Sequence, residues 1–289
     1  LQVRSTDPLS LLIGANLHLT TVSGTINPYP RTEPHPHVLA PGVLPVPTPE
    51  VHPFPRTEPH VGVLNVDDHV VEARSPSLPA GHAAFVHSLI LDQAPDTTVT
   101  VRSVPVAEGQ ATAWDVARAM MALADTGVHV INLSAGCRTP DGEPPLLLRR
   151  VVELLRSRVV LVAAAGNDNL AAAPTWPAAL PGVVAVGARN IDDSLADFSP
   201  RLPWVTCTAP GSLIIHLTAT VPLLDGTSMD FEGNAAWSGT AFAAATVSGA
   251  IAAHTVLGQV TAQEALAGLL AGDGGVVRKY VPGDDGQRA

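Results

Sequence analysis

From residue 61 onward, short runs of β-branched residues alternate with stretches in which apolar residues recur at helical spacing. The β-branched runs predict strands over 61–66, 99–104, 128–133 and 159–165. Helical spacing follows Gly81-His82 with Phe85, Leu89 and Ile90, spans 114–125, and returns with Leu147, Val151, Leu154 and Leu155. Such alternation predicts an α/β fold with an open, doubly wound, mostly parallel sheet and helices on both faces.

The first sixty residues have a different pattern, because prolines are dense there and one octapeptide nearly repeats. Residues 28–35 read Pro-Tyr-Pro-Arg-Thr-Glu-Pro-His, and residues 53–60 read Pro-Phe-Pro-Arg-Thr-Glu-Pro-His. Each proline removes a backbone donor and biases its predecessor toward extended geometry. We therefore predict an extended Pro-rich arm over residues 1–60 and a folded domain over residues 61–289.

Charge and hydropathy exclude two classes of partner. The net charge is −10, from 26 acidic and 16 basic residues without a Lys/Arg cluster, so nothing would follow a phosphate backbone and we expect no nucleic acid. The longest apolar stretch, 242–257, falls short of the roughly 20 residues that span a bilayer, so we expect no membrane span. Cys137 and Cys207 form neither a metal-ligand pattern nor a disulfide framework.

Polar residues gather where the predicted strands end, which is where open parallel sheets place their active groups. The first strand ends at Asp67-Asp68, the first helix opens with Gly81-His82, and a later strand ends in Gly166-Asn167. An acid, a base and an amide donor thus converge. Acyl transfer needs these three together with a nucleophile.

The nucleophile is expected late in the chain, where residues 237–249 read Trp-Ser-Gly-Thr-Ala-Phe-Ala-Ala-Ala-Thr-Val-Ser-Gly. This run resembles the Gly-Thr-Ser helix start of the subtilisin-like serine proteases (subtilases), with Ala241 at the serine position. The segments 63–69, 81–86, 130–136, 176–188 and 209–211 are also similar to that family, in its order of acid, base, oxyanion asparagine and nucleophile. The resemblance therefore identifies 61–289 as a subtilase-like catalytic domain, and the arm as a candidate remnant of a pro-segment.

The resemblance implies a role for each site residue. Asp67 would orient His82, His82 would act as the base, and Asn167 would stabilise the oxyanion; Asn65 and Asp68 are alternatives for the carboxylate if the strand register differs. The family strand that pairs with the substrate backbone is matched by Leu133, Ser134, Ala135 and Gly136. Asp168 and Thr175 match positions near the pocket for the substrate side chain, and an acidic floor there would favour a basic residue.

Some features depart from the family pattern. Ala83, Ala84 and Ala245 replace its usual residues, and only 14 residues separate Asp67 from His82. A connection this short lacks the loop that binds calcium in many relatives, so we assign no metal site and no cofactor, although calcium cannot be read from the sequence. The tripeptide Gly-Thr-Ser that ends at Ser228 precedes no apolar helix, so we do not take Ser228 as the nucleophile.

Two interpretations of Ala241 remain. In the first, the protein is a serine endopeptidase whose nucleophile has been replaced, which the survival of Asp67, His82 and Asn167 favours. In the second, it is a natural pseudoprotease that binds peptides. Both predict a peptide or protein partner. The sequence does not fix the compartment, and the resemblance favours secretion.

Overall fold

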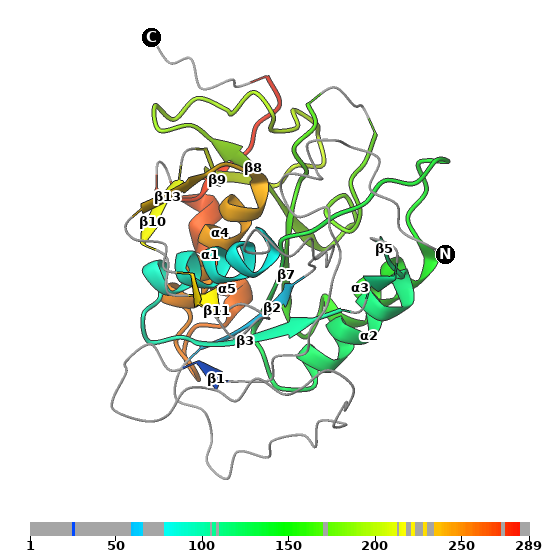
Figure 1. Cartoon of the computed structure of the whole chain (residues 1–289), viewed down its shortest axis with the longest axis horizontal. Helices are drawn as coiled ribbons and strands as arrows, with labels where there is room; N and C mark the ends of the chain where they lie inside the picture. Colours follow the sequence, from blue (N-terminus) through cyan, green and yellow to red (C-terminus); the bar gives the residue numbers. More distant parts are fainter. Residues whose placement is uncertain are drawn as a thin grey trace.

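The computed structural model of the chain is built on one eight-stranded sheet (Figure 1). It describes residues 25–26, 59–65, 78–104, 106–107, 110–169, 173–212, 214–217, 221–222, 228–229, 234–272 and 275–283. The strands of the main sheet are β1 Thr25–Ile26, β2 His60–Asn65, β3 Thr98–Ser103, β6 Val130–Leu133, β7 Val160–Ala164, β8 Val183–Arg189, β9 Cys207–Pro210 and β14 Arg278–Lys279. The helices are α1 Leu78–Gln93, α2 Ala113–Ala124, α3 Leu146–Leu155, α4 Thr240–His254 and α5 Ala262–Ala271.

Among the described residues, three small antiparallel pairs lie outside this sheet. They are formed by β4 Val106–Ala107 with β5 Gln110–Ala111, β10 Ile214–Leu217 with β13 Asn234–Trp237, and β11 Val221–Pro222 with β12 Ser228–Met229. Ser228 therefore lies on a short strand and not at a helix start, as its sequence context indicated.

The strand order of the main sheet is β1-β3-β2-β6-β7-β8-β9-β14, and all six inner strands run parallel. Only the two outermost strands, each two residues long, are antiparallel to their neighbours. The predicted fold class, a doubly wound and mostly parallel sheet, is confirmed. The four strands predicted from the β-branched runs correspond to β2, β3, β6 and β7.

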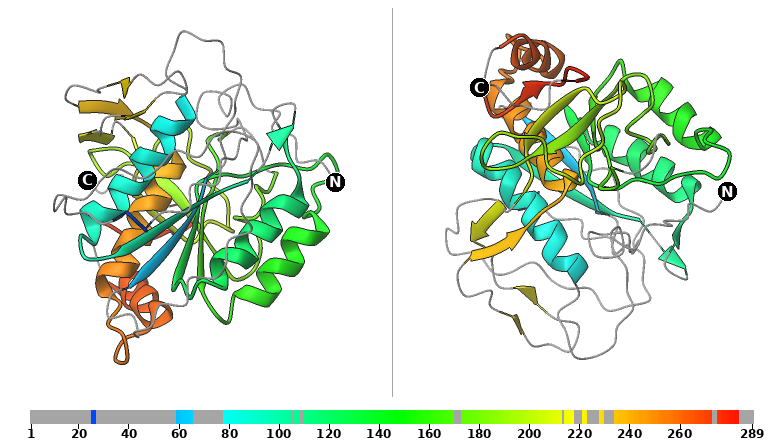
Figure 2. Two further views of the ribbon diagram at one scale, coloured as in Figure 1. Left: turned by 60° about the horizontal axis from the view of Figure 1, so that its bottom comes forward. Right: turned by 90° about the horizontal axis from the view of Figure 1, so that it is seen from above.

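Helices cover both faces of the sheet (Figure 2). Alternate residues of β7 show why: Val160 and Val162 pack in the core formed with α1, α4 and α5, whereas Leu161 and Ala163 pack in the core formed with α2 and α3. A strand buried on both faces needs apolar residues at successive positions, which is the continuous pattern seen in the sequence.

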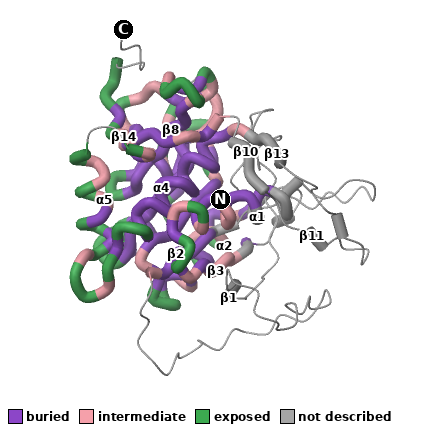
Figure 3. The backbone as a smooth tube through the Cα atoms, turned by 90° about the vertical axis from the view of Figure 1, so that its left-hand side faces the viewer, coloured by how far each residue is buried: buried purple, intermediate pink, exposed green. Residues whose placement is uncertain are grey.

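Helix α4 is the most buried helix of the described chain, while α5 beside it is largely exposed on its outer side (Figure 3). Every residue from Thr240 to Ala252 is buried. This helix is apolar on all sides, so it can only lie inside the molecule. Of the described helices, none is long and apolar enough to cross a membrane.

Helix α3 corrects one prediction. Its buried face consists of Leu148, Val151, Val152 and Leu155, whereas Leu147 and Leu154 are 36% and 63% exposed. Three successive leucines at 146–148 allow two helical phases, and the sequence analysis chose residues from both. The observed phase keeps the spacing i, i+3, i+4, i+7.

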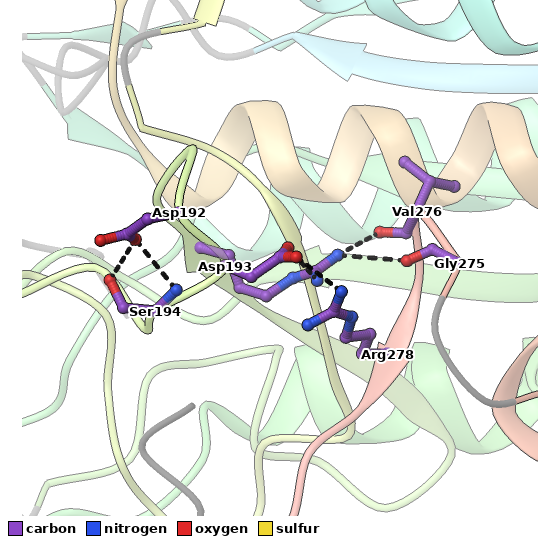
Figure 4. A network of polar contacts seen from close by, with 7 residues as sticks. Asp192, Asp193, Ser194, Gly275, Val276 and Arg278 are labelled. Atoms are coloured by element: carbon purple, nitrogen blue, oxygen red, sulfur yellow. Dashed lines mark hydrogen bonds and ion pairs between the residues drawn. The ribbon is translucent and has the colours of Figure 1, made fainter. Parts of the chain in front are cut away.

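The end of the described chain returns to the sheet and is held there by a polar network (Figure 4). The side chain of Arg189, 4% exposed, donates to Asp193 Oδ1 at 2.8 Å and to the carbonyl of Val276 at 2.7 Å. Arg278 donates to the other oxygen of Asp193 at 2.6 Å. Tyr280 then joins a small apolar cluster with Leu195, Val205 and Ala165, the residue directly before the predicted oxyanion segment.

The predicted arm over residues 1–60 is described only in part. Thr25–Ile26 pairs with Thr100 and Val99 of β3, and His60 already belongs to β2. The repeat at 28–35 and most of the repeat at 53–60 lie outside the described residues, so the arm and its possible origin as a pro-segment stay predictions.

Candidate functional site

The site is built where β6 and β7 end, because the first turn of α4 lies against both strand ends. The two strands are parallel and in register, with Leu133 opposite Ala163. Ser134 follows β6 directly, and Gly166-Asn167 follows β7 after one residue. Adjacent carboxyl ends thus bring two distant segments to one edge of the sheet.

The first turn of α4 takes its cap from Asn167. The residue before the helix, Gly239, has no side chain to offer. Instead, Asn167 Oδ1 accepts from the backbone N–H of Thr240 at 2.8 Å and from its hydroxyl at 3.1 Å. The backbone N–H of Gly166 in turn donates to Thr240 Oγ1 at 3.0 Å. These bonds use only the amide oxygen of Asn167, and its NH₂ group is a donor by nature.

A second contact holds the following residue. The hydroxyl of Ser134 donates to the carbonyl of Ala241 at 2.9 Å, and Ser134 itself accepts from Asn132. Residue 241 therefore lies between two strand ends, and its side chain is 2% exposed. The positive end of the helix dipole at the first turn of α4 favours negative charge at this position.

Helix α1 brings His82 to the same turn. The imidazole ring lies 5.4 Å from the ring of Phe242, centroid to centroid, and Phe242 also contacts Phe85 at 4.8 Å. The two helices cross closely because Gly249 has no side chain: a Cβ there would lie 2.7 Å from the carbonyl oxygen of Ile90. Burial lowers the pKa of His82 to about 4, so the ring is neutral at pH 7.

The predicted opening of this helix needs a correction. Helix α1 begins at Leu78, before Gly81-His82, so His82 lies one turn inside it. Pro79 at the second helical position is tolerated because the first-turn N–H groups have no intrahelical partner.

Asp67, the predicted carboxylate, and its alternative Asp68 both lie outside the described residues. Asn65 is the last residue of β2, which pairs with β6 through Leu64 and Leu133. Strand β2 therefore ends at the same edge of the sheet as β6 and β7. The assignment of Asp67 as the carboxylate stays a prediction.

The predicted substrate segments lie against each other through Thr175. A Cβ built on Gly136 would lie 2.6 Å from Cγ2 of Thr175, and one built on Gly166 would lie 2.9 Å from its Oγ1. The side chain of Thr175 is 6% exposed, so it fills the space between these two glycines. Leu133 is buried at the end of β6, while Ala135 is half-buried.

Asp168 has a partner that sequence reasoning missed. Arg138 donates to its carboxylate at 2.5 Å and to its carbonyl at 3.4 Å, and both side chains are about three-quarters buried or more. The expected negative charge is therefore offset, which weakens the argument for a basic substrate residue. Nothing in the spacing of Arg138 and Asp168 in the sequence indicated this pair.

No group of three or more His, Cys, Asp or Glu side chains that could hold a metal ion occurs among the residues the structure describes. That the protein uses no cofactor therefore stays a prediction from the sequence, and calcium binding is not decided by it.

Known proteins resemble this chain in sequence and in fold. The Subtilase family (peptidase S8) matches residues 77–265. A thermophilic serine proteinase from Bacillus sp. (strain AK1) is 35% identical over 145 residues, which are 48% of this chain and 34% of that protein. Subtilisin BL from Lederbergia lenta is 31% identical over 153 residues, 51% of this chain and 54% of that protein. The chain thus matches about half or less of the length of these relatives.

Solved structures agree with this. The prenylagaramide maturation protease PagA is 28% identical, with a TM-score of 0.53, over 68% of this chain and 75% of that chain. The patellamide maturation protease PatA is 29% identical, also with a TM-score of 0.53, over 67% of this chain and 76% of that chain.

Proposed function

Because this chain belongs to the subtilase family, we propose that it carries a serine-endopeptidase site in which Ala241 stands at the nucleophile position, and that it holds peptides without cutting them. One observation above all supports the proposal. The amide oxygen of Asn167 is bonded to Thr240, the residue immediately before 241, so its NH₂ group would be available to donate to an oxyanion formed at residue 241.

The other residues fit the roles of a proton-transfer site. His82 would take the proton of a serine at 241 and return it to the leaving amine, for which it must start neutral. Burial keeps the ring neutral at pH 7, and the same low pKa makes it a weak base unless a carboxylate stabilises its protonated form. Asp67, two residues beyond the end of β2, would fix the tautomer of His82 and stabilise its protonated form. Alanine at 241 keeps the helix and removes only the attacking oxygen.

The peptide would pair with the backbone of residues 134–136, because an endopeptidase holds several substrate residues in extended geometry before attack. Leu133 cannot take part as the sequence predicted, since it is buried and already pairs with Leu64 of β2 and Ala163 of β7. Thr175 fills the space between Gly136 and Gly166, which favours a small substrate side chain at that point. The ion pair of Asp168 with Arg138 leaves little net charge there to select a basic residue. These contacts give affinity that does not depend on the missing hydroxyl.

The test restores the nucleophile. Ala241→Ser should create peptidase activity that serine-directed phosphonates titrate, because the remaining roles are filled. The matched control is the double variant Ala241→Ser with His82→Ala, in which turnover should fall by several orders of magnitude. A restored chain with no activity above that control would contradict the endopeptidase assignment.

The unaltered chain tests the binding half of the proposal. Calorimetry with extended peptides should detect binding, and a photocrosslinker on the peptide should label residues near Ser134. If neither method finds a bound peptide, the substrate assignment of residues 134–136 is wrong even though the fold is right. The alternatives for Ala241 differ in the encoding gene: a serine codon at 241 favours a replaced nucleophile, and an alanine codon favours a natural pseudoprotease.

A further inference from the structure

We infer that Ser248 and Asn132 are positioning residues, which act through Ser134 to fix the backbone of residue 241 at the start of α4. The inference rests on the proposed function in taking residue 241 as the centre of the site. It goes beyond it by assigning a role to two residues, neither of which is expected to contact substrate.

Three hydrogen bonds form one directed chain. The hydroxyl of Ser248 donates to Asn132 Oδ1 at 3.0 Å, the amide NH₂ of Asn132 donates to Ser134 Oγ at 2.8 Å, and the hydroxyl of Ser134 donates to the carbonyl of Ala241 at 2.9 Å. Ser248 and Asn132 are 0% exposed, and Ser134 is 8% exposed. Because an amide fixes which of its ends donates, each hydroxyl hydrogen in the chain has one direction.

The chain begins and ends on the same helix. Ser248 and Ala241 are seven residues apart, close to two turns, and Asn132 with Ser134 connects them through the end of β6. The end of β6 is therefore hydrogen-bonded to α4 at two positions along the helix, Ser248 and Ala241. Such a connection resists both sliding and rotation of the helix against β6, and bonds between buried groups are strengthened by the low local dielectric.

Other hydroxyl groups near this helix behave differently. Thr246 donates to the carbonyl of Phe242 at 3.1 Å, and Thr255 donates to the carbonyl of Ile251 at 2.8 Å. Both satisfy themselves four residues back, as buried serine and threonine residues in helices commonly do. Ser248 instead bonds across to β6. This contrast indicates a role in placing the helix rather than simple satisfaction of a buried hydroxyl.

The test uses a thiol introduced by Ala241→Cys, whose ionisation reports the surroundings of residue 241 without any substrate. The chain has two other thiols, Cys137 and Cys207, and burial raises the pKa of each to about 12. Thiolate absorbance at 240 nm between pH 4 and 9 therefore follows the introduced thiol alone.

The first turn of α4 and Asn167 stabilise a thiolate only while they stay aligned with it. In the Ala241→Cys background, Ser248→Ala and Ser134→Ala should each raise the pKa of the introduced thiol by about half a unit or more, roughly a threefold change in its ionisation constant. Thr246→Val is the matched control. It removes a buried hydroxyl from the same helix but leaves the chain intact, so the thiol pKa should stay that of the background.

Circular dichroism at each pH separates misfolding from misplacement, and Ser134→Ala, at the less buried end, keeps the test open if Ser248→Ala does not fold. The inference is overturned if the Ser134 and Ser248 variants titrate like the Thr246→Val control. Since no peptide takes part, failure of the proposed peptidase leaves this result unaffected, and the reverse also holds.

Discussion

The crossing of α1 and α4 gives the sharpest prediction, because it depends on the absence of one side chain. Replacing Gly249 by alanine would place a Cβ 2.7 Å from the carbonyl oxygen of Ile90, 2.8 Å from Cβ of Gln93 and 3.0 Å from Cα of Ile90. Two of these neighbours are backbone atoms, so relief requires the helices to move apart. Gly268, on the exposed side of α5, has no atom within 4 Å of the same added Cβ and serves as the control.

Two opposing effects set the magnitude. Alanine is favoured over glycine inside a helix by roughly 0.8–1 kcal/mol, which both variants gain. Overpacking a buried contact costs roughly 1–3 kcal/mol, which only Gly249→Ala incurs. We expect Gly268→Ala to raise the free energy of unfolding by up to about 1 kcal/mol and Gly249→Ala to lower it by up to about 2 kcal/mol.

Urea unfolding followed by circular dichroism measures both changes. A second readout comes from His82, since separation of the two helices should admit water and raise the pKa of its imidazole from about 4 toward 6.5, as seen by NMR titration. If Gly249→Ala stabilises the protein as much as Gly268→Ala does, the close crossing of α1 and α4 described above is wrong.

Three further predictions concern buried groups. The imidazole of His82 has a lower pKa in the folded than in the unfolded chain, so the free energy of unfolding is highest above pH 6.5 and falls by up to about 3 kcal/mol as the pH falls toward 4. His82→Gln should remove this part of the pH dependence of urea unfolding. Arg189→Met should lower the free energy of unfolding by about 2–3 kcal/mol, because the carbonyls of Gly275 and Val276 lose their donor. Arg278→Met, at a more exposed position, should lower it by at most about 1 kcal/mol, and equal losses would contradict the network. Cys137 and Cys207 should not react with Ellman's reagent at pH 8 until the chain unfolds, and then release two equivalents; fast reaction in the native state would contradict their burial.

Much of the fold could be predicted because the inner strands are buried on both faces. Residues 159–165 are apolar at every position, a pattern that marks a central parallel strand, and the structure has β7 there. The phase of α3 could not be fixed because Leu146, Leu147 and Leu148 offer more apolar positions than one face uses. The outermost strands escaped prediction for a different reason: two residues carry no periodic signal.

The site was predicted to the extent that short motifs carry it. The run around Ala241 and the Gly166-Asn167 turn were found from the sequence, and the structure joins them through Thr240. The chain from Ser248 to Ala241 was not found, because contacts between residues more than a hundred positions apart leave no trace in a single sequence.

The two outermost strands have a consequence for how copies of this protein meet one another. A long exposed edge strand offers unpaired N–H and C=O groups to another chain, and is a common start of edge-to-edge aggregation. In the part of the chain that the structure describes, β3 and β9 are covered by β1 and β14, which run antiparallel and are each two residues long. Removing the pairing of Thr25–Ile26 or of Arg278–Lys279 would expose backbone groups of β3 or β9 that are now paired, so the first sign of losing either strand should be self-association rather than unfolding.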